Sequence, residues 1–205
     1  MSQALVLPAG WPAQVGAVLL ALTVFLVVLD QISVHWALPL DRRLARSVIR
    51  TRNRKETRLM RLLSFWGGAY GIMAVTAIVV LLLALSGHRE TAALYFGLVA
   101  LSIAYALAVK VLTARRRPSH GLERQRTYSF PSAHSLAAAA MYGSLGFLAF
   151  GTSAGALFLI PAGALVLAIG TSRVYLGVHY PSDVLGGYVA GAVWVWIFLF
   201  LNAGR

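Results

Sequence analysis

The sequence predicts an all-α membrane protein in which six transmembrane helices form one bundle. Hydrophobic residues make up 59% of the 205-residue chain, whereas soluble domains are usually about half apolar. These residues are gathered into long runs with few charges, and each run approaches the roughly 20 residues that cross a hydrocarbon core. Because lipid offers the backbone no hydrogen-bond partner, we expect helices rather than strands.

The six apolar runs follow one another along a single domain, residues 1–205. We expect the spans over about Val15–Leu29, Leu62–Leu85, Thr91–Leu112, Ser132–Phe150, Ala154–Ser172 and Asp183–Leu201. No Lys or Arg precedes the first run and no small-residue cleavage site follows it, which favours a retained span over a signal peptide. In the last span, Gly187 and Gly191 have the spacing that lets two helices approach closely.

A basic segment, residues 41–61, connects the first two spans. Leu44, Val48 and Ile49 can form one apolar face, which is typical of an interfacial helix that contacts anionic headgroups. A solvated charged connector is the alternative. The formal net charge of +12, on so apolar a chain, favours an anionic lipid or substrate over nucleic acid.

The first of three polar clusters lies at the end of the third span. Lys110 is followed there by Arg115-Arg116-Arg117-Pro118. Arg117 comes about two helical turns after Lys110, so both cations can share one helix face. Arginine binds phosphate oxygens in pairs, which makes this face a candidate phosphate site. Arg115 and Arg116 are equally well explained as anchors of the span in the headgroups.

The second cluster, Ser129 to Ser135, stands at the start of the fourth span. Pro131 favours a helix start. The free N–H groups of Ser132, Ala133 and His134 would then form a helix N-terminus, which attracts anions. His134 is placed to donate a proton to an atom bound there, although a lone histidine at a helix start is more often a polar cap.

The third cluster, Ser172 to Asp183, leads into the sixth span. We expect Pro181 to open the helix, with His179 just before it. Asp183 follows His179 by four residues and can accept a hydrogen bond from one ring nitrogen, which leaves the other nitrogen free to attack. A buried ion pair between two helices is the alternative. Arg173 adds another cation.

Alternation of the spans places all three clusters on the same side of the membrane, opposite both termini. Together they supply a nucleophile, an orienting carboxylate, a proton donor and several cations, which is a full set for phosphoryl transfer. An anion transporter with a basic vestibule would also gather charge on one side. It would not require the spacing of His179 and Asp183.

The three clusters resemble the signature motifs of the type-2 phosphatidic acid phosphatase family, also called lipid phosphate phosphatases. The family pattern is Lys, six residues, Arg-Pro; then Pro-Ser-Gly-His; then Ser-Arg, five residues, His, three residues, Asp. Residues 110–118 fit the first motif and residues 172–183 fit the third. The second motif, within residues 129–135, departs once, because Ala133 stands where the family usually has glycine.

The resemblance implies a role for each matched residue. His179 would be the nucleophile that forms a phosphohistidine, and Asp183 would orient it. His134 would protonate the leaving oxygen and later activate water. The phosphate would be held by Lys110, Arg117, Ser132, the backbone N–H of Ala133, and Arg173. The resemblance also implies that the reaction needs no metal ion and no other cofactor.

The substrate implied is a membrane lipid phosphate or diphosphate. Candidates are a polyprenyl diphosphate such as undecaprenyl diphosphate, and phosphatidylglycerol phosphate; sphingoid phosphates and the phosphates of lipid A stay open. Phosphate transfer to a second lipid or sugar headgroup is the alternative to hydrolysis. Bacterial family members place the site outside the cytoplasm, which implies a plasma-membrane protein with cytoplasmic termini. The positive-inside rule taken alone predicts the opposite.

Overall fold

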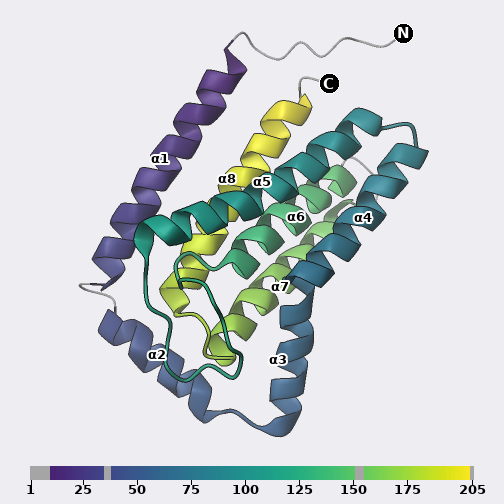
Figure 1. The fold of residues 1–205 in the computed structure, drawn as a ribbon. Coiled ribbons are helices and arrows are strands. Elements are labelled where there is room, and N and C mark those ends of the chain that lie inside the picture. Colours follow the sequence, from purple (N-terminus) through teal and green to yellow (C-terminus); the bar gives the residue numbers. More distant parts are fainter. Residues whose placement is uncertain (1–9, 35–37, 151–154, 204–205) are drawn as a thin grey trace.

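The computed structural model describes residues 10–34, 38–150 and 155–203, and over these residues it is helical without strands, as the sequence predicts. The helices are α1 (Trp11–Ile32), α2 (Leu38–Arg50), α3 (Arg54–Trp66), α4 (Ala69–Leu85), α5 (Arg89–Thr113), α6 (Ala133–Phe150), α7 (Gly155–Tyr175) and α8 (Pro181–Ala203). Figure 1 shows the long helices packed in one bundle. The start of α1 and the end of α8 lie at one end of the bundle, and α2 lies at the other.

Several of these helices can cross a membrane. Among the described residues, four are long and apolar enough, namely α1, α5, residues 157–175 of α7, and α8. The bent pair α3–α4 adds a fifth span if it is counted as one. By length and composition, the described residues thus give four or five spans, where the sequence predicted six.

The second predicted span, Leu62–Leu85, is not one straight helix. The chain turns by 47° between α3 and α4, at Gly67 and Gly68. A Cβ atom on Gly67 would collide with Ile169 of α7, so glycine is needed for this close approach. The prediction of an unbroken helix was wrong because the adjacent glycines end α3 where α7 packs against it.

The basic segment between the first two spans is largely helical. It forms α2 and the first part of α3, and α3 is capped by Asn53, whose Oδ1 accepts from the Glu56 N–H at 2.9 Å. Val48 and Met60 pack against a small core of Tyr175, Leu176 and Val178. One side of these helices therefore covers the loop that leads into α8, while Leu44 of the predicted apolar face and most of the charged side chains are exposed.

The most extensive helix packing joins α6 to α8 and α7. A Cβ atom on Gly191 would collide with Ala139, and one on Gly187 would lie 2.7 Å from the Ser132 carbonyl oxygen. The close approach predicted for these glycines is confirmed. It brings the start of α6 against the first turn of α8, where the Ser132 N–H donates to the Asp183 carbonyl at 2.9 Å. The second and third clusters are joined by this contact.

The ends of the predicted spans differ slightly from those observed. Helix α6, which corresponds to the fourth predicted span, begins at Ala133, after Pro131. Pro181 is the first residue of α8, as expected for a proline at a helix start. The predicted start of the fifth span, Ala154, lies outside the described residues.

Candidate active site

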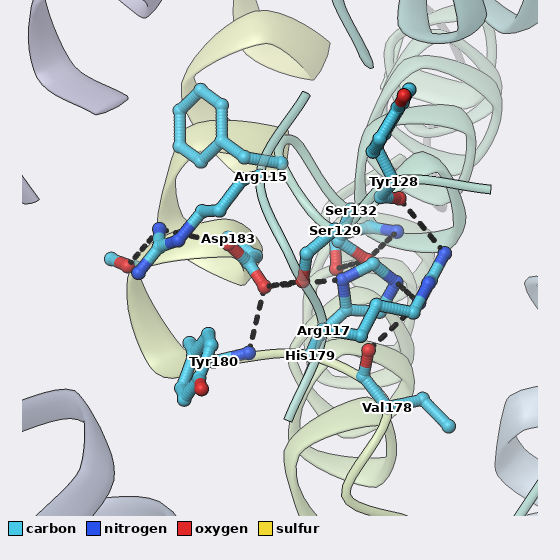
Figure 2. A network of polar contacts seen from close by, with 12 residues as sticks. Arg115, Arg117, Tyr128, Ser129, Ser132, Val178, His179, Tyr180 and Asp183 are labelled. Carbon is cyan, nitrogen blue, oxygen red and sulfur yellow. Dashed lines mark hydrogen bonds and ion pairs between the residues drawn. The ribbon is translucent and has the colours of Figure 1, made fainter. Parts of the chain in front are cut away.

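The three clusters meet at the end of the bundle opposite the start of α1 and the end of α8, around the imidazole of His179 (Figure 2). His179 is only 2% exposed; its Nδ1 lies 3.3 Å from Asp183 Oδ2, and its Nε2 lies 3.1 Å from Arg117 Nη1. A guanidinium can only donate hydrogen bonds, so Nε2 is the acceptor and Nδ1 carries the proton. This tautomer leaves a lone pair on Nε2, as a nucleophilic imidazole requires.

The charge state of His179 suits the same role. Burial lowers the pKa of His179 from 6.5 to about 3; Lys110 and Arg117 lower it further, while Asp183 opposes the shift. The imidazole is therefore neutral at neutral pH, with Nε2 unprotonated.

The carboxylate of Asp183 is fully buried and has two differently occupied oxygens. Its Oδ2 accepts from the Tyr180 N–H at 2.7 Å, and also from the Ser129 hydroxyl and His179. Its Oδ1 forms an ion pair with Arg115 Nη1 at 2.9 Å. Ser129 was not assigned a role from the sequence, because its partner lies in a different cluster, 54 residues away.

Lys110 and Arg117 meet at the loop between α5 and α6. Lys110 Nζ donates to the carbonyl oxygens of Tyr128 at 2.8 Å and Ser129 at 3.1 Å. Arg117 Nη2 donates to the Tyr128 carbonyl at 3.0 Å, and its Nε donates to the Thr127 carbonyl at 2.6 Å. Both cations thus hold the segment 127–129 beside His179.

The helical reasoning for this pair was wrong. Helix α5 ends at Thr113, and Ala114 has a left-handed conformation with φ of 49°, so Arg117 lies in a loop. The two cations converge because the loop returns toward α5.

Arg117 is charged at neutral pH. Burial, followed by repulsion from Arg173, lowers the pKa of Arg117, but only to about 10.

Arg173, on α7, is the least satisfied cation of the site. Its side chain is 1% exposed, and its Nη1 donates to the Ser64 hydroxyl and to Glu123 Oε2, the latter at 3.1 Å. Its Nε and Nη2 are buried and have no hydrogen-bond partner. An unpaired buried donor costs about 1–3 kcal/mol. Donors of this kind on a cation indicate a place where an anion binds.

The start of α6 differs in detail from the prediction. The N–H of Ser132 donates to the carbonyl oxygen of Asp183, so the prediction of a free N–H at Ser132 was wrong. The Ser132 hydroxyl accepts from the Ser135 hydroxyl at 3.0 Å. The N–H groups of Ala133 and His134 make no hydrogen bond to any described residue. They are the donors that the helix end offers to an anion.

His134 lies on the same side of the helix end as the cations. It is within electrostatic range of Arg173, His179, Lys110 and Arg117. A Cβ atom on Gly68 would lie 3.4 Å from its Nε2, so the bend between α3 and α4 borders this imidazole. All the residues predicted from the three clusters therefore gather at this end of the bundle, with the Ser132 hydroxyl turned toward Ser135.

Arg115 and Arg116 have different environments. Arg116 is exposed, which agrees with an anchor in the headgroups. Arg115 is buried and donates to Asp41 Oδ2 and to the Ser182 hydroxyl, both at 2.8 Å, so the anchor interpretation is wrong for it. Sequence reasoning missed Asp41 and Ser182 as partners of Arg115, because both lie far from Arg115 along the chain.

A cavity of about 580 Å³ lies beside the site, between α5 and the loop 125–128. Lys110 and Arg117 line it on one side. Leu107 and Val111 add an apolar wall, and Val111 is 69% exposed on the outside of the bundle.

Among the described residues, no group of three or more His, Cys, Asp or Glu side chains is arranged to hold a metal ion.

Comparison with known proteins agrees with this geometry. The model of the PAP2 superfamily matches residues 91–204. Phosphatidylglycerophosphatase B of Bacillus subtilis is 40% identical over 83 residues, which are 38% of this chain and 41% of that protein. Decaprenylphosphoryl-5-phosphoribose phosphatase of Mycobacterium tuberculosis is 38% identical over 100 residues, 44% of this chain and 50% of that protein. The chain thus matches half or less of the length of these relatives.

A solved structure shows the same fold over most of the chain. The transmembrane PAP2-type phosphatidylglycerolphosphate phosphatase from Bacillus subtilis superposes with a TM-score of 0.79, over 90% of this chain and 94% of that chain. The sequence identity is 22%, so this similarity concerns the fold.

Proposed function

This chain belongs to the PAP2 superfamily, and from this premise we propose that it is an integral membrane phosphatase that hydrolyses a lipid phosphate or diphosphate without a metal ion. One observation carries the proposal. The unprotonated Nε2 of His179 contacts Arg117, and the buried Arg173, within electrostatic range of Arg117 and Lys110, has two nitrogens without a partner. A tetrahedral dianion between them would satisfy those donors and present its phosphorus to the lone pair.

In the first step, His179 Nε2 attacks the terminal phosphorus and the bond to the bridging oxygen breaks. His134, which holds an added proton while the substrate dianion lies beside it, gives this proton to the leaving oxygen, and the lipid product departs. Asp183 accepts the Nδ1–H bond and stabilises the positive charge that develops on the ring. Lys110, Arg117 and Arg173 stabilise the negative charge of the transferring phosphoryl group.

In the second step, water attacks the phosphorus of the phosphohistidine. His134, now neutral, takes a proton from this water, the N–P bond breaks, and the electron pair returns to Nε2 of His179. Inorganic phosphate leaves, and the starting protonation states are restored. The free N–H of Ala133 would bind a phosphate oxygen in both steps, and so would the Ser132 hydroxyl, which accepts from Ser135 and keeps its own proton to donate.

The cavity beside α5 supports a lipid as the substrate. Its cationic side is formed by Lys110 and Arg117, which also border the nucleophile, and its wall of Leu107 and Val111 faces outward. A headgroup phosphate at the cations would leave its acyl or prenyl chain against the apolar wall. A polyprenyl diphosphate such as undecaprenyl diphosphate and phosphatidylglycerol phosphate are the substrates we propose; the name of the first relative supports the latter, and that of the second supports a phosphate linked to a polyprenyl chain.

We further propose six spans, with α3–α4 as one bent span and α6, of 18 residues, enclosed by α5, α7 and α8. An even number agrees with the start of α1 and the end of α8 lying at the same end of the bundle (Figure 1). We place those termini in the cytoplasm and the site outside, because Arg115, Arg117 and Arg173 serve the site and are not topology signals. A reporter after Arg205 that is active on the outer side would contradict this orientation.

The test is phosphate release from a panel of lipid phosphates and diphosphates, with EDTA present. We expect full activity in EDTA and its loss in His179→Ala, by a factor of about 10⁴ or more for a covalent nucleophile. His120→Ala is the matched control, because His120 is exposed and its side chain has no partner among the described residues. Wild-type hydrolysis by His179→Ala would refute the assigned nucleophile, and phosphate transfer to an added headgroup would replace hydrolysis by phosphotransfer.

A further inference from the structure

A buried ion cluster lies behind the catalytic carboxylate, on the side away from the phosphate site (Figure 2). Its centre is Arg115, whose side chain is 3% exposed. Arg115 Nη1 is 2.9 Å from Asp183 Oδ1, and Nη2 is 2.8 Å from Asp41 Oδ2. Asp30 Oδ1, on α1, lies 3.8 Å from Nη1. One guanidinium therefore joins three carboxylates from three helices.

The cluster has further supports that restrict the guanidinium. Ser182 donates its N–H to Asp41 Oδ1 at 3.0 Å and its hydroxyl to Asp41 Oδ2 at 2.5 Å, while that hydroxyl accepts from Arg115. The guanidinium carbon lies 5.0 Å from the centre of the Tyr180 ring and 6.0 Å from that of Phe130. The head of Arg115 is thus held by oxygens at its edge and aromatic rings beside it.

Two of the acids come from a part of the chain that the family model does not match. Asp30 and Asp41 lie on α1 and α2, whereas the match covers residues 91–204. We propose that Arg115, held by Asp41, is a positioning residue for the catalytic dyad, and that α2 thereby completes the active site. This inference rests on the proposed function, since it assigns a role in the same reaction.

The physical argument concerns the orientation of one carboxylate. Asp183 must direct Oδ2 toward Nδ1 of His179, and its other oxygen must be kept from competing for that role. The contact with Arg115 fixes Oδ1; it is an ion pair without hydrogen-bond alignment, because Oδ1 makes no geometrically suitable hydrogen bond. The attraction is therefore coulombic, and burial of both groups strengthens it. Arg115 acts on the reaction only through Asp183.

Lysine cannot replace this arrangement. The planar guanidinium reaches Asp183 with Nη1 and Asp41 with Nη2 simultaneously, whereas an ammonium is a single point of charge on a shorter head. Arg115→Lys preserves the charge that the buried acids require, so it tests the geometry. Asp41→Asn preserves the shape of the side chain that contacts Nη2 of Arg115 and removes its charge.

The experiment measures kcat and KM of the full-length protein with the substrate of the panel that the wild type hydrolyses fastest. We expect Arg115→Lys and Asp41→Asn to lower kcat by about tenfold to a hundredfold, as is typical when a group that orients a reactive residue is lost. We expect KM to stay within about twofold, because neither residue touches the phosphate. Arg89→Lys and Glu90→Gln, which alter exposed charges in the same ways at the far end of α5, are the controls and should behave as wild type.

A double-mutant cycle separates positioning from a merely structural role. In an Asp183→Asn background, Arg115→Lys should cause no further loss in the single-turnover rate, because the group through which it acts is already impaired. An undiminished further loss would overturn the proposal, as would a raised KM with unchanged kcat. If Arg115→Lys does not fold, the same comparison with the isosteric Asp41→Asn decides the question.

The outcomes also separate this inference from the proposed function. If the wild type releases no phosphate from any substrate of the panel, the proposed function fails. If the wild type is active and His179→Ala is not, while Arg115→Lys and Asp41→Asn match their controls, the positioning role alone fails.

Discussion

Two buried arginines at the same end of the bundle have opposite surroundings. Arg115 faces three carboxylates and places both of its terminal nitrogens against them. Arg173 meets a single carboxylate, that of Glu123, and keeps Nε and Nη2 without partners. The two side chains are almost equally buried, at 3% and 1% exposed. The difference lies in which charges the fold supplies and which it leaves for a ligand.

The comparison teaches how one imidazole acquires two distinct faces. Asp183, which is paired with Arg115, accepts the proton of Nδ1, whereas Arg117 contacts the lone pair of Nε2 and Lys110 lies within electrostatic range. Arg115, whose two terminal nitrogens are both paired with carboxylates, stabilises the site before substrate arrives. Arg173, with Nη2 and Nε unpaired, gains partners only when an anion binds, which is how binding energy becomes available to the reaction.

The largest effect expected from this comparison is that of Arg173→Lys. The lysine preserves the charge but loses the fork that offers two free donors to the phosphate. We expect kcat/KM to fall by about 10²–10³, the size of effect seen when a preorganised donor to a developing anion is removed. Kinetics with the preferred lipid substrate measure this loss.

The matched control is Arg50→Lys, an exposed arginine at the end of α2 without a side-chain partner among the described residues. Normal kinetics in Arg173→Lys would show that only the charge of residue 173 matters. The distinction drawn between the two arginines would then lose its functional meaning.

Local spacing along the chain predicted the pairing of His179 with Asp183 better than it predicted the surroundings of Arg115. The relation of His179 to Asp183 follows from four residues across a helix start, and Pro181 marks that start. The environment of Arg115 depends on Asp41, 74 residues earlier, and no periodicity links the two. Pairing across that distance is decided by helix packing, which residue order does not specify.

Similar limits explain the errors within single elements. Lys110 and Arg117 do converge, but through a loop, because Ala114 leaves the helical conformation. The pair Gly67-Gly68 was a visible signal for a break in the second span, yet hydropathy alone treats it as continuous. In both places the apolar pattern predicted that a span exists, and backbone conformation decided where it ends.

The two faces of His179 also predict an effect of pH. With its pKa lowered to about 3, the imidazole should stay neutral and reactive at pH 5. A histidine with the ordinary pKa of about 6.5 would be about thirtyfold less available there. The rate of phosphohistidine formation from a nitrophenyl phosphate measures this, because its leaving group needs no proton from His134.

Removal of a cation should move the acid limit of that rate. Lys110 is one of the charges that lower the pKa of His179, so Lys110→Met should shift the loss of rate to higher pH, whereas Lys55→Met, at an exposed site, should not.

The lowered pKa of His179 also makes the stability of the folded protein fall as the pH falls. As pH falls from 6.5 toward 3, the unfolded chain binds a proton that the folded imidazole excludes, and this residue's contribution to stability is lost.

The smallest expected effect concerns Glu123, the single acid beside Arg173. Its carboxylate is 30% exposed and lies 3.1 Å from Nη1, where it competes with a bound phosphate for the same guanidinium. Partly exposed ion pairs contribute about 0.2–1 kcal/mol. Glu123→Gln should therefore lower KM by at most about fivefold, with kcat nearly unchanged. Kinetics with the lipid substrate and inhibition by inorganic phosphate both measure this.

The direction of the change decides what Glu123 does for Arg173. If the carboxylate only occupies the guanidinium, its removal strengthens binding of substrate and of inorganic phosphate by the same factor, while the exposed control Glu90→Gln changes neither. A raised KM would mean that Glu123 holds Arg173 in place. Arg173 would then depend on an acidic partner as Arg115 does, and the contrast between the two arginines would be reduced to a difference in degree.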